Sequence, residues 1–255
     1  MALKALIFDV DGTLADTEKD GHRVAFNMAF KEAELNWNWD ENLYGELLAV
    51  TGGKERIAYY LEQFNTTFIK PSNFTEFVAQ LHASKTAYYM RLMEQGKVPL
   101  RTGVEQLIEQ ARNSGLRLAI ATTTTPANVT ALLHNTLGAE SESWFEVIAA
   151  GDIVPAKKPA ADIFVYALEK LGLSADECLA FEDSENGLKS SKGAALKTII
   201  TINDYTKDQD FFNADLILDQ FGDSGSPFTV LDAKGLEMES FSFFNLELAQ
   251  LINDQ

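Results

Sequence analysis

The chain has little of what marks disulfide-stapled, thiolate-metal or nucleic-acid-binding proteins. It holds one cysteine in 255 residues, so no internal disulfide can form. That residue, Cys178, stands in the apolar run CLAF, which predicts a small buried hydrophobe. Lys and Arg number 21 against 38 Asp and Glu, a formal net charge of −17. A phosphate backbone needs a basic surface, so this excess of acid argues against nucleic acid as a partner.

Long apolar runs are also missing. No run approaches the length that spans a membrane, so we expect no membrane partner. The first apolar run begins almost at the N-terminus and leaves no room for a signal peptide. We therefore expect a cytoplasmic protein, or one of the plastid stroma if a transit peptide was removed. The hydrophobic content of 46% is that of an ordinary packed globule. A chain of 255 residues is long enough for a large core and a smaller module.

Short apolar runs alternate with segments of helical period over much of the chain. Strands buried on both faces are predicted at 5–8, 116–121, 145–150, 178–182, 196–201 and 214–218. Between them, 103–115 and 161–172 place apolar residues on one stripe and end at Gly115 and Gly172. This alternation predicts an α/β fold with a doubly wound, Rossmann-like parallel sheet.

Residues 16–96 differ, because they carry helical patterns and no convincing buried strand. We predict an α/β core domain of residues 1–15 and 97–255, with an all-helical domain of residues 16–96 inserted after the first strand. The tail after Asp219 is ambiguous. Its cluster of Phe241, Phe243 and Phe244 predicts either core packing or a covering edge.

Polar side chains follow four of the predicted strands. In open parallel sheets, ligands bind beyond the carboxyl ends of the strands, and these ends meet at one edge. The four sets are Asp9 with Asp11, Thr122 with Thr123, Lys157 with Lys158, and Glu182 with Asp183. Carboxylates that meet at one point cannot all stay ionised unless a cation joins them.

A magnesium ion is the cation that this set favours. Carboxylate oxygens with no His or Cys companion suit Mg²⁺, which also binds substrate phosphate. The predicted metal ligands are Asp9, Asp11, Glu182 and Asp183.

The remaining residues suit phosphoryl transfer. Asp9 can attack phosphorus and carry an aspartyl-phosphate, while Asp11 protonates the leaving oxygen and later takes a proton from water. Thr122 and the N–H of Thr123 can bind phosphoryl oxygens, and Lys158 can neutralise the charge that gathers on them.

Each set also has a purely structural interpretation. The DVDG motif and the threonine run could be turns, and Lys157 and Lys158 could be solvated surface. Glu182 and Asp183 could cap the next helix. Their joint occurrence at strand ends favours the catalytic interpretation.

These residues resemble the four motifs of the haloacid dehalogenase superfamily. DVDGT resembles its first motif, Thr122 its second, Lys158 in KKP its third, and Glu182-Asp183 its fourth. The resemblance implies that Asp9 is the nucleophile and Asp11 the acid/base. An aspartate at position 11 implies a phosphatase or phosphotransferase, because a dehalogenase needs no proton donor there. The helical insert resembles the small cap of β-phosphoglucomutases and of many sugar-phosphate phosphatases.

Three segments resemble the CbbY-like family more narrowly: residues 16–27, 43–57 and 150–159. Members of that family remove a phosphate from xylulose-1,5-bisphosphate. The resemblance implies a Mg²⁺-dependent phosphatase that acts on this small phosphorylated sugar. The alternatives are a mutase like β-phosphoglucomutase, a phosphatase for another small phosphorylated metabolite, and a non-catalytic regulator. The intact aspartates and Lys158 disfavour the regulator.

The cap segment TGGKER can bind a second phosphate through the N–H groups of Gly52 and Gly53 and the side chains of Lys54 and Arg56. The alternative is a turn that starts a helix. Further residues predicted to contact sugar hydroxyls, unless they only pack the cap or its hinge, are Glu18, His22 and Tyr44. We expect a monomer.

Overall fold

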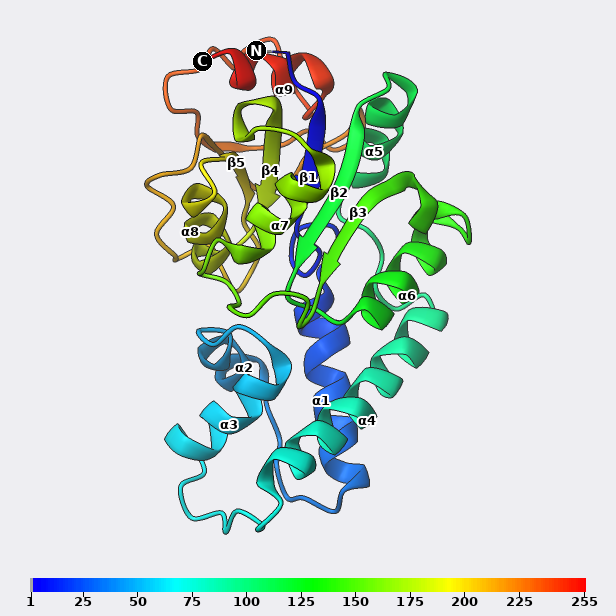
Figure 1. Ribbon diagram of the computed structural model, residues 1–255, viewed down its shortest axis with the longest axis vertical. Coiled ribbons are helices and arrows are strands. Elements are labelled where there is room, and N and C mark those ends of the chain that lie inside the picture. Colours follow the sequence, from blue (N-terminus) through cyan, green and yellow to red (C-terminus); the bar gives the residue numbers. More distant parts are fainter. Residues whose placement is uncertain (1) are drawn as a thin grey trace.

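A mostly parallel sheet forms the centre of the upper half of the molecule in Figure 1. The computed structural model describes residues 2–255, and its sheet has the order β3-β2-β1-β4-β5-β6-β7. The strands are β1 Ala5–Phe8, β2 Arg117–Thr122, β3 Phe145–Ala150, β4 Cys178–Glu182, β5 Lys197–Thr201, β6 Leu216–Leu218 and β7 Val230–Asp232. The predicted α/β fold is confirmed. All six predicted strands are present and parallel, whereas β7 was not predicted and pairs antiparallel with β6.

Helices cover both faces of the sheet, which explains why its strands are continuous apolar runs. On one face, Leu6 and Phe8 of β1 share a core with three helices: α5 Val104–Asn113, α6 Pro126–Leu137 and α9 Leu246–Asp254. On the other, Ala5 and Ile7 pack with α7 Asp162–Leu171, and α8 Glu185–Gly193 lies beside it. Short 3₁₀ turns at Ser141–Trp144 and Ala175–Glu177 lead into β3 and β4.

The remaining helices lie beyond the carboxyl ends of the strands, in the lower half of Figure 1. A π-helical turn, Glu18–His22, runs into α1 Arg23–Glu32, and then follow α2 Glu41–Leu47, α3 Gly53–Gln63 and α4 Phe74–Glu94. These helices enclose an aromatic core of their own, in which Phe26 and Phe30 lie 4.6 and 4.8 Å from Trp39 between ring centroids. We call this group the cap and keep its predicted bounds, 16–96, as a proposal.

The chain enters and leaves the cap at adjacent points. Ala15 pairs with Leu100 in an antiparallel bridge, and the N–H of Arg101 donates to the carbonyl of Leu14 at 2.9 Å. The guanidinium of Arg101 donates to the carbonyl oxygens of Thr201, at 3.0 Å, and of Asp219, at 2.7 Å. The two crossings are therefore fixed to each other and to the loops that follow β5 and β6.

The C-terminal tail both packs into the core and covers an edge of the sheet, the two alternatives that its phenylalanines predicted. Phe244 is 1% exposed and lies 5.3 Å from Phe181 of β4 between ring centroids. Phe241 packs at the rim of the same core, and Phe243 is partly exposed. The tail also supplies the edge strand β7 and the covering helix α9. Among the described residues, none of the helices combines the length and the apolar character needed to span a membrane.

Truncating Phe244 tests whether the tail belongs to the core. Phe244→Ala should lower the free energy of unfolding by about 3–5 kcal/mol, because it removes a buried ring and leaves a cavity. Urea denaturation measures this. The matched control is Phe212→Ala, at a ring that is 77% exposed, which should change stability by less than about 0.5 kcal/mol. Equal stability of the two variants would contradict the role given to the tail.

Candidate active site

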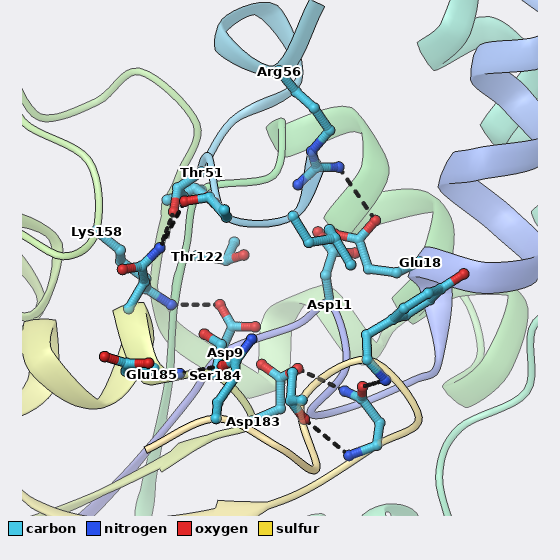
Figure 2. Close-up of a pocket in the computed structure, with 18 residues that line it drawn as sticks. Asp9, Asp11, Glu18, Thr51, Arg56, Thr122, Lys158, Asp183, Ser184 and Glu185 are labelled. Carbon is cyan, nitrogen blue, oxygen red and sulfur yellow. Dashed lines mark hydrogen bonds and ion pairs between the residues drawn. The ribbon is translucent and has the colours of Figure 1, made fainter. Parts of the chain in front are cut away.

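Asp9 lies at the carboxyl end of β1, where the backbone places it beside β4. Its N–H donates to the carbonyl of Phe181 at 2.9 Å. Its carboxylate is only 6% exposed and accepts a hydrogen bond from Nζ of Lys158 at 2.5 Å (Figure 2). The same Nζ donates to Oε1 of Glu182, also at 2.5 Å. Lys158, in the loop after β3, therefore links Asp9 after β1 to Glu182 at the end of β4.

The charges of these three groups depend on one another. Burial disfavours the charged form of Lys158, but the carboxylates of Asp9 and Glu182 outweigh it, so the pKa of Lys158 is raised. Burial raises the pKa of Glu182 to about 8, although Lys158 acts in the opposite direction. Burial also raises the pKa of Asp9, so the one ammonium does not fully compensate the two carboxyl groups that share it.

Asp183 adds a third carboxylate to the same place. One oxygen from each of Asp9, Glu182 and Asp183 lies within 4.8 Å of the others. Burial and the charge of Asp9 raise the pKa of Asp183 well above its usual range. Asn203 donates to Asp183 at 2.7 Å and orients it. A donor set of carboxylate oxygens, crowded and short of positive charge, fits a hard divalent cation.

The glycine of the DVDG motif makes this approach possible. Gly12 has a φ of +87°, a conformation that side chains other than glycine rarely adopt. A Cβ at this position would also overlap the carboxylate of Asp183. The loop after β1 can therefore lie against the loop after β4 only with glycine here.

We call the carboxylates of Asp9, Glu182 and Asp183 the acidic cluster. The carboxylate of Asp11 faces the cap instead. Its Oδ1 accepts from the hydroxyl of Thr17 at 2.5 Å and lies 2.8 Å from Nε2 of His22. Nδ1 of His22 lies 2.9 Å from Nζ of Lys85. Because an ammonium can only donate, Nδ1 accepts and Nε2 carries the hydrogen that points to Asp11. Burial opposes the charged carboxylate, but His22 and Thr17 outweigh it, so the pKa of Asp11 is lowered.

A cavity of about 390 Å³ separates the strand ends from the cap. Its lining from the sheet side includes Asp9, Asp11, Thr122, Thr123, Lys158 and Asp183. From the cap, its lining includes Glu18, Thr51 and Arg56 (Figure 2). The predicted catalytic side chains thus surround one space of the size that a small ligand needs.

Two predicted cap residues, Glu18 and Arg56, line this cavity, and Tyr44 holds them. Arg56 donates to the hydroxyl of Tyr44 at 2.7 Å and lies 3.5 Å from Glu18. The hydroxyl of Tyr44 also donates to Glu18. Tyr44 itself is fully buried and does not line the cavity, so its contact with a sugar stays a prediction.

The other predicted cap residues lie around a smaller cavity of about 50 Å³, whose lining includes His22, Gly52, Gly53 and Lys54. Gly52 directly precedes α3, so GGKER does start a helix. Lys54 contacts Asp152 of the core at 2.5 Å. Phosphate binding by Gly52, Gly53 and Lys54 stays a prediction, and so does a contact of His22 with sugar hydroxyls.

Two structural interpretations of the strand-end motifs are wrong. Ser184 caps α8 by accepting from the N–H of Gly187 at 3.1 Å, so Glu182 and Asp183 are free of that role. Lys158 is 5% exposed and is not a surface residue. Of the predicted metal ligands, Glu182 lies in the acidic cluster with Asp9 and Asp183. The carboxylate of Asp11 lies outside it, and its role as a ligand stays a prediction.

Sequence reasoning missed Asn203, Lys85 and Arg101. Asn203 comes two residues after β5, so the rule that found the other strand-end residues could have found it. Lys85 lies in the middle of α4 and Arg101 at the exit from the cap, and no sequence pattern distinguishes them from surface cations.

The comparisons with known proteins agree with this geometry. Residues 3–195 match the model of the haloacid dehalogenase-like hydrolases, so the chain belongs to this family and is a phosphatase within it. It is CbbY-like. The CbbY protein of Rhodobacter capsulatus is 50% identical over 215 residues, which cover 84% of this chain and 92% of that protein. The plasmid CbbY protein of Cupriavidus necator is 45% identical over 225 residues, 88% of either chain.

A solved structure extends the likeness to the whole arrangement. A CbbY mutant from Rhodobacter sphaeroides, crystallised with xylulose-1,5-bisphosphate, gives a TM-score of 0.81 at 43% identity. The match covers 88% of this chain and 96% of that chain. The predicted membership of a CbbY-like phosphatase family is confirmed.

Magnesium binding should release protons from the acidic cluster. The pKa of Glu182 is raised to about 8 and that of Asp183 is also raised, so the cluster holds protons near pH 7 until a cation displaces them. Affinity should therefore fall as the pH is lowered from 8 to 6. Calorimetric titration with MgCl₂ at pH 7 should give different apparent enthalpies in buffers of different ionisation enthalpy. The variant Asn203→Ala should bind Mg²⁺ about 10- to 100-fold more weakly. Equal enthalpies in both buffers would refute the proton release.

Proposed function

We propose that the protein is a Mg²⁺-dependent phosphatase of a sugar bisphosphate, xylulose-1,5-bisphosphate, which acts through an aspartyl-phosphate on Asp9. The observation that carries this proposal is that Asp9 contacts Lys158, shares the acidic cluster with Glu182 and Asp183, and lines a cavity that the cap covers. The ligand of the similar CbbY mutant supports the choice of substrate.

Asp9 has the environment that a nucleophile needs. Lys158 holds Oδ1, which leaves Oδ2 to form a bond to phosphorus while the bond from phosphorus to the sugar oxygen breaks. Lys158 lines the cavity and neutralises charge on the phosphoryl oxygens, and Thr122 and the N–H of Thr123 bind them. A magnesium ion held by Asp9 and Asp183, with Glu182 beside them, would supply further positive charge for the phosphoryl group.

Asp11 serves as the proton carrier. In the first step a protonated Asp11 gives its proton to the leaving sugar oxygen. In the second step the Asp11 carboxylate takes a proton from the water that attacks the phosphorus of the aspartyl-phosphate, which restores Asp9 and releases phosphate. The contacts of Asp11 with Thr17 and His22 favour the ionised carboxylate, which is the form that the second step requires and which makes a protonated Asp11 a strong acid for the first step.

Arg56 is the strongest candidate for the second phosphate. It is buried, lines both cavities, and its Nε has no hydrogen-bond partner among the described residues. An unpaired buried donor on a guanidinium is costly, and a phosphate oxygen would satisfy it.

Replacing the nucleophile should stop the reaction and leave the fold intact. Asp9→Asn keeps the side-chain volume but removes the attacking oxygen, so phosphate release from xylulose-1,5-bisphosphate should fall at least about 10⁴-fold. Phosphate release is measured by a colorimetric assay, and circular dichroism reports folding. Full activity of this variant would refute the nucleophile. Isomerisation of a sugar phosphate by the wild type without stoichiometric phosphate release would identify a mutase instead.

Arg56→Ala should impair bisphosphates far more than monophosphates. Loss of a charge-assisted contact to the second phosphate should raise KM for the bisphosphate about 10- to 100-fold, because hydrogen bonds to charged groups contribute about 1.5–3 kcal/mol. Steady-state kinetics on matched mono- and bisphosphates measure this. Arg91→Ala, at an exposed arginine of the same cap, is the control. Equal losses on both substrates would remove Arg56 from the phosphate site.

A further inference from the structure

A chain of four charged side chains joins the cap to the core beside the smaller cavity. Lys54 and Glu55 begin α3 of the cap, and Asp152 and Lys157 lie in the loop that follows β3. Lys54 lies 2.5 Å from Asp152, Asp152 lies 3.0 Å from Lys157, and Lys157 lies 2.7 Å from Glu55. The charges alternate along this chain, so every neighbouring pair attracts.

The two lysines of this chain stabilise the charged form of Asp152. Hydrogen bonds from Lys54 and then from Lys157 lower the pKa of Asp152 to about 2. The side chain of Lys157 is only 16% exposed, less than those of its three partners. Lys157 therefore sits at the least solvated point of the chain, where its two ion pairs are the least screened.

Lys157 is also the residue directly before Lys158. Its side chain points to Glu55 of the cap, whereas the next side chain points to Asp9 and Glu182 of the core. The carbonyl of Lys157 accepts from the N–H of Ala160 at 3.0 Å, which folds this segment into a tight turn. A displacement of Lys157 would consequently move the backbone that carries Lys158.

We propose that Glu55 and Lys157 are positioning residues, whose ion pair couples the seating of the cap over the cavity to the placement of Lys158 against Asp9. This inference rests on the proposed function, because it assigns Lys158 to the phosphoryl site. With the cap in place, Glu55 holds the turn from one side and Asp152 from the other. With the cap away, Lys157 loses Glu55 and the turn that carries Lys158 is held less firmly.

A second interpretation of the same residues makes a different prediction. Lys54 and Lys157 line the smaller cavity and could bind a substrate phosphate directly. In that case a reversal of charge at Lys157 would raise KM for a bisphosphate, and no change at Glu55 would restore it. A positioning pair should respond to charge complementarity and should affect kcat on every phosphorylated substrate.

A charge swap separates the two interpretations. Glu55→Lys and Lys157→Glu should each lower kcat about fivefold or more on both sugar mono- and bisphosphates, since each places like charges in contact. The double variant should have a kcat at least about twofold above that of Lys157→Glu alone, because the 55–157 pair attracts again in the reversed order, while the carboxylate placed at 157 still repels Asp152. Loss confined to KM for the bisphosphate, or a double variant no better than Lys157→Glu alone, would overturn the positioning role.

The control is a charge change at a similar pair inside the cap. Lys70 lies 3.6 Å from Glu62, and both residues belong to the cap and have exposed side chains. Glu62→Lys should leave kcat and KM unchanged.

Limited proteolysis of the same variants gives a readout that does not need turnover. Cleavage at the crossings between cap and core should be faster in both single variants and should be slower in the double variant than in Lys157→Glu alone. If the wild type releases no phosphate from sugar phosphates, the proposed function fails, yet proteolysis still decides whether the pair seats the cap. If the wild type releases phosphate but the charge changes alter neither proteolysis nor kcat, the positioning role fails and the proposed function stands.

Discussion

The ammonium of Lys158 is the interaction on which the rest of the site depends. It lies 2.5 Å from both Asp9 and Glu182 in a buried environment, where two unpaired carboxylates would destabilise the fold. A single cation cannot balance this group once Asp183 is added at the same strand edge. The sheet therefore concentrates carboxyl groups at one point on the wall of the cavity, where a second cation would stabilise their ionised forms and attract phosphoryl oxygens.

The parts of this arrangement that follow from local rules could be predicted from sequence. Six strands and the helices between them are visible because buried strands are short apolar runs and amphipathic helices repeat every three to four residues. Their carboxyl ends then bring Asp9, Thr122, Lys158 and Asp183 together, since strand order need not be known to know which edge a residue occupies.

The parts that depend on tertiary contacts could not be predicted. The direction of the Asp11 carboxylate is set by Thr17, His22 and Lys85, and the last of these approaches from a helix 63 residues further along the chain than His22. Tyr44 could be a sugar ligand or a packing residue by its sequence, and only the structure shows that it contacts Glu18 and Arg56. The antiparallel strand β7 has only three residues and none of them is buried, so it does not stand out from a loop.

The adjacent crossings at Ala15 and Leu100 have a consequence for how such proteins diversify. When the two ends of an insertion are neighbours, the insertion can change in length or fold without moving the strands, because the two points where it joins the sheet domain stay in place. Exchange of one helical insert for another would therefore leave the sheet intact. The catalytic edge would keep its geometry only if the new insert also supplied the contacts that Thr17 and His22 make with Asp11.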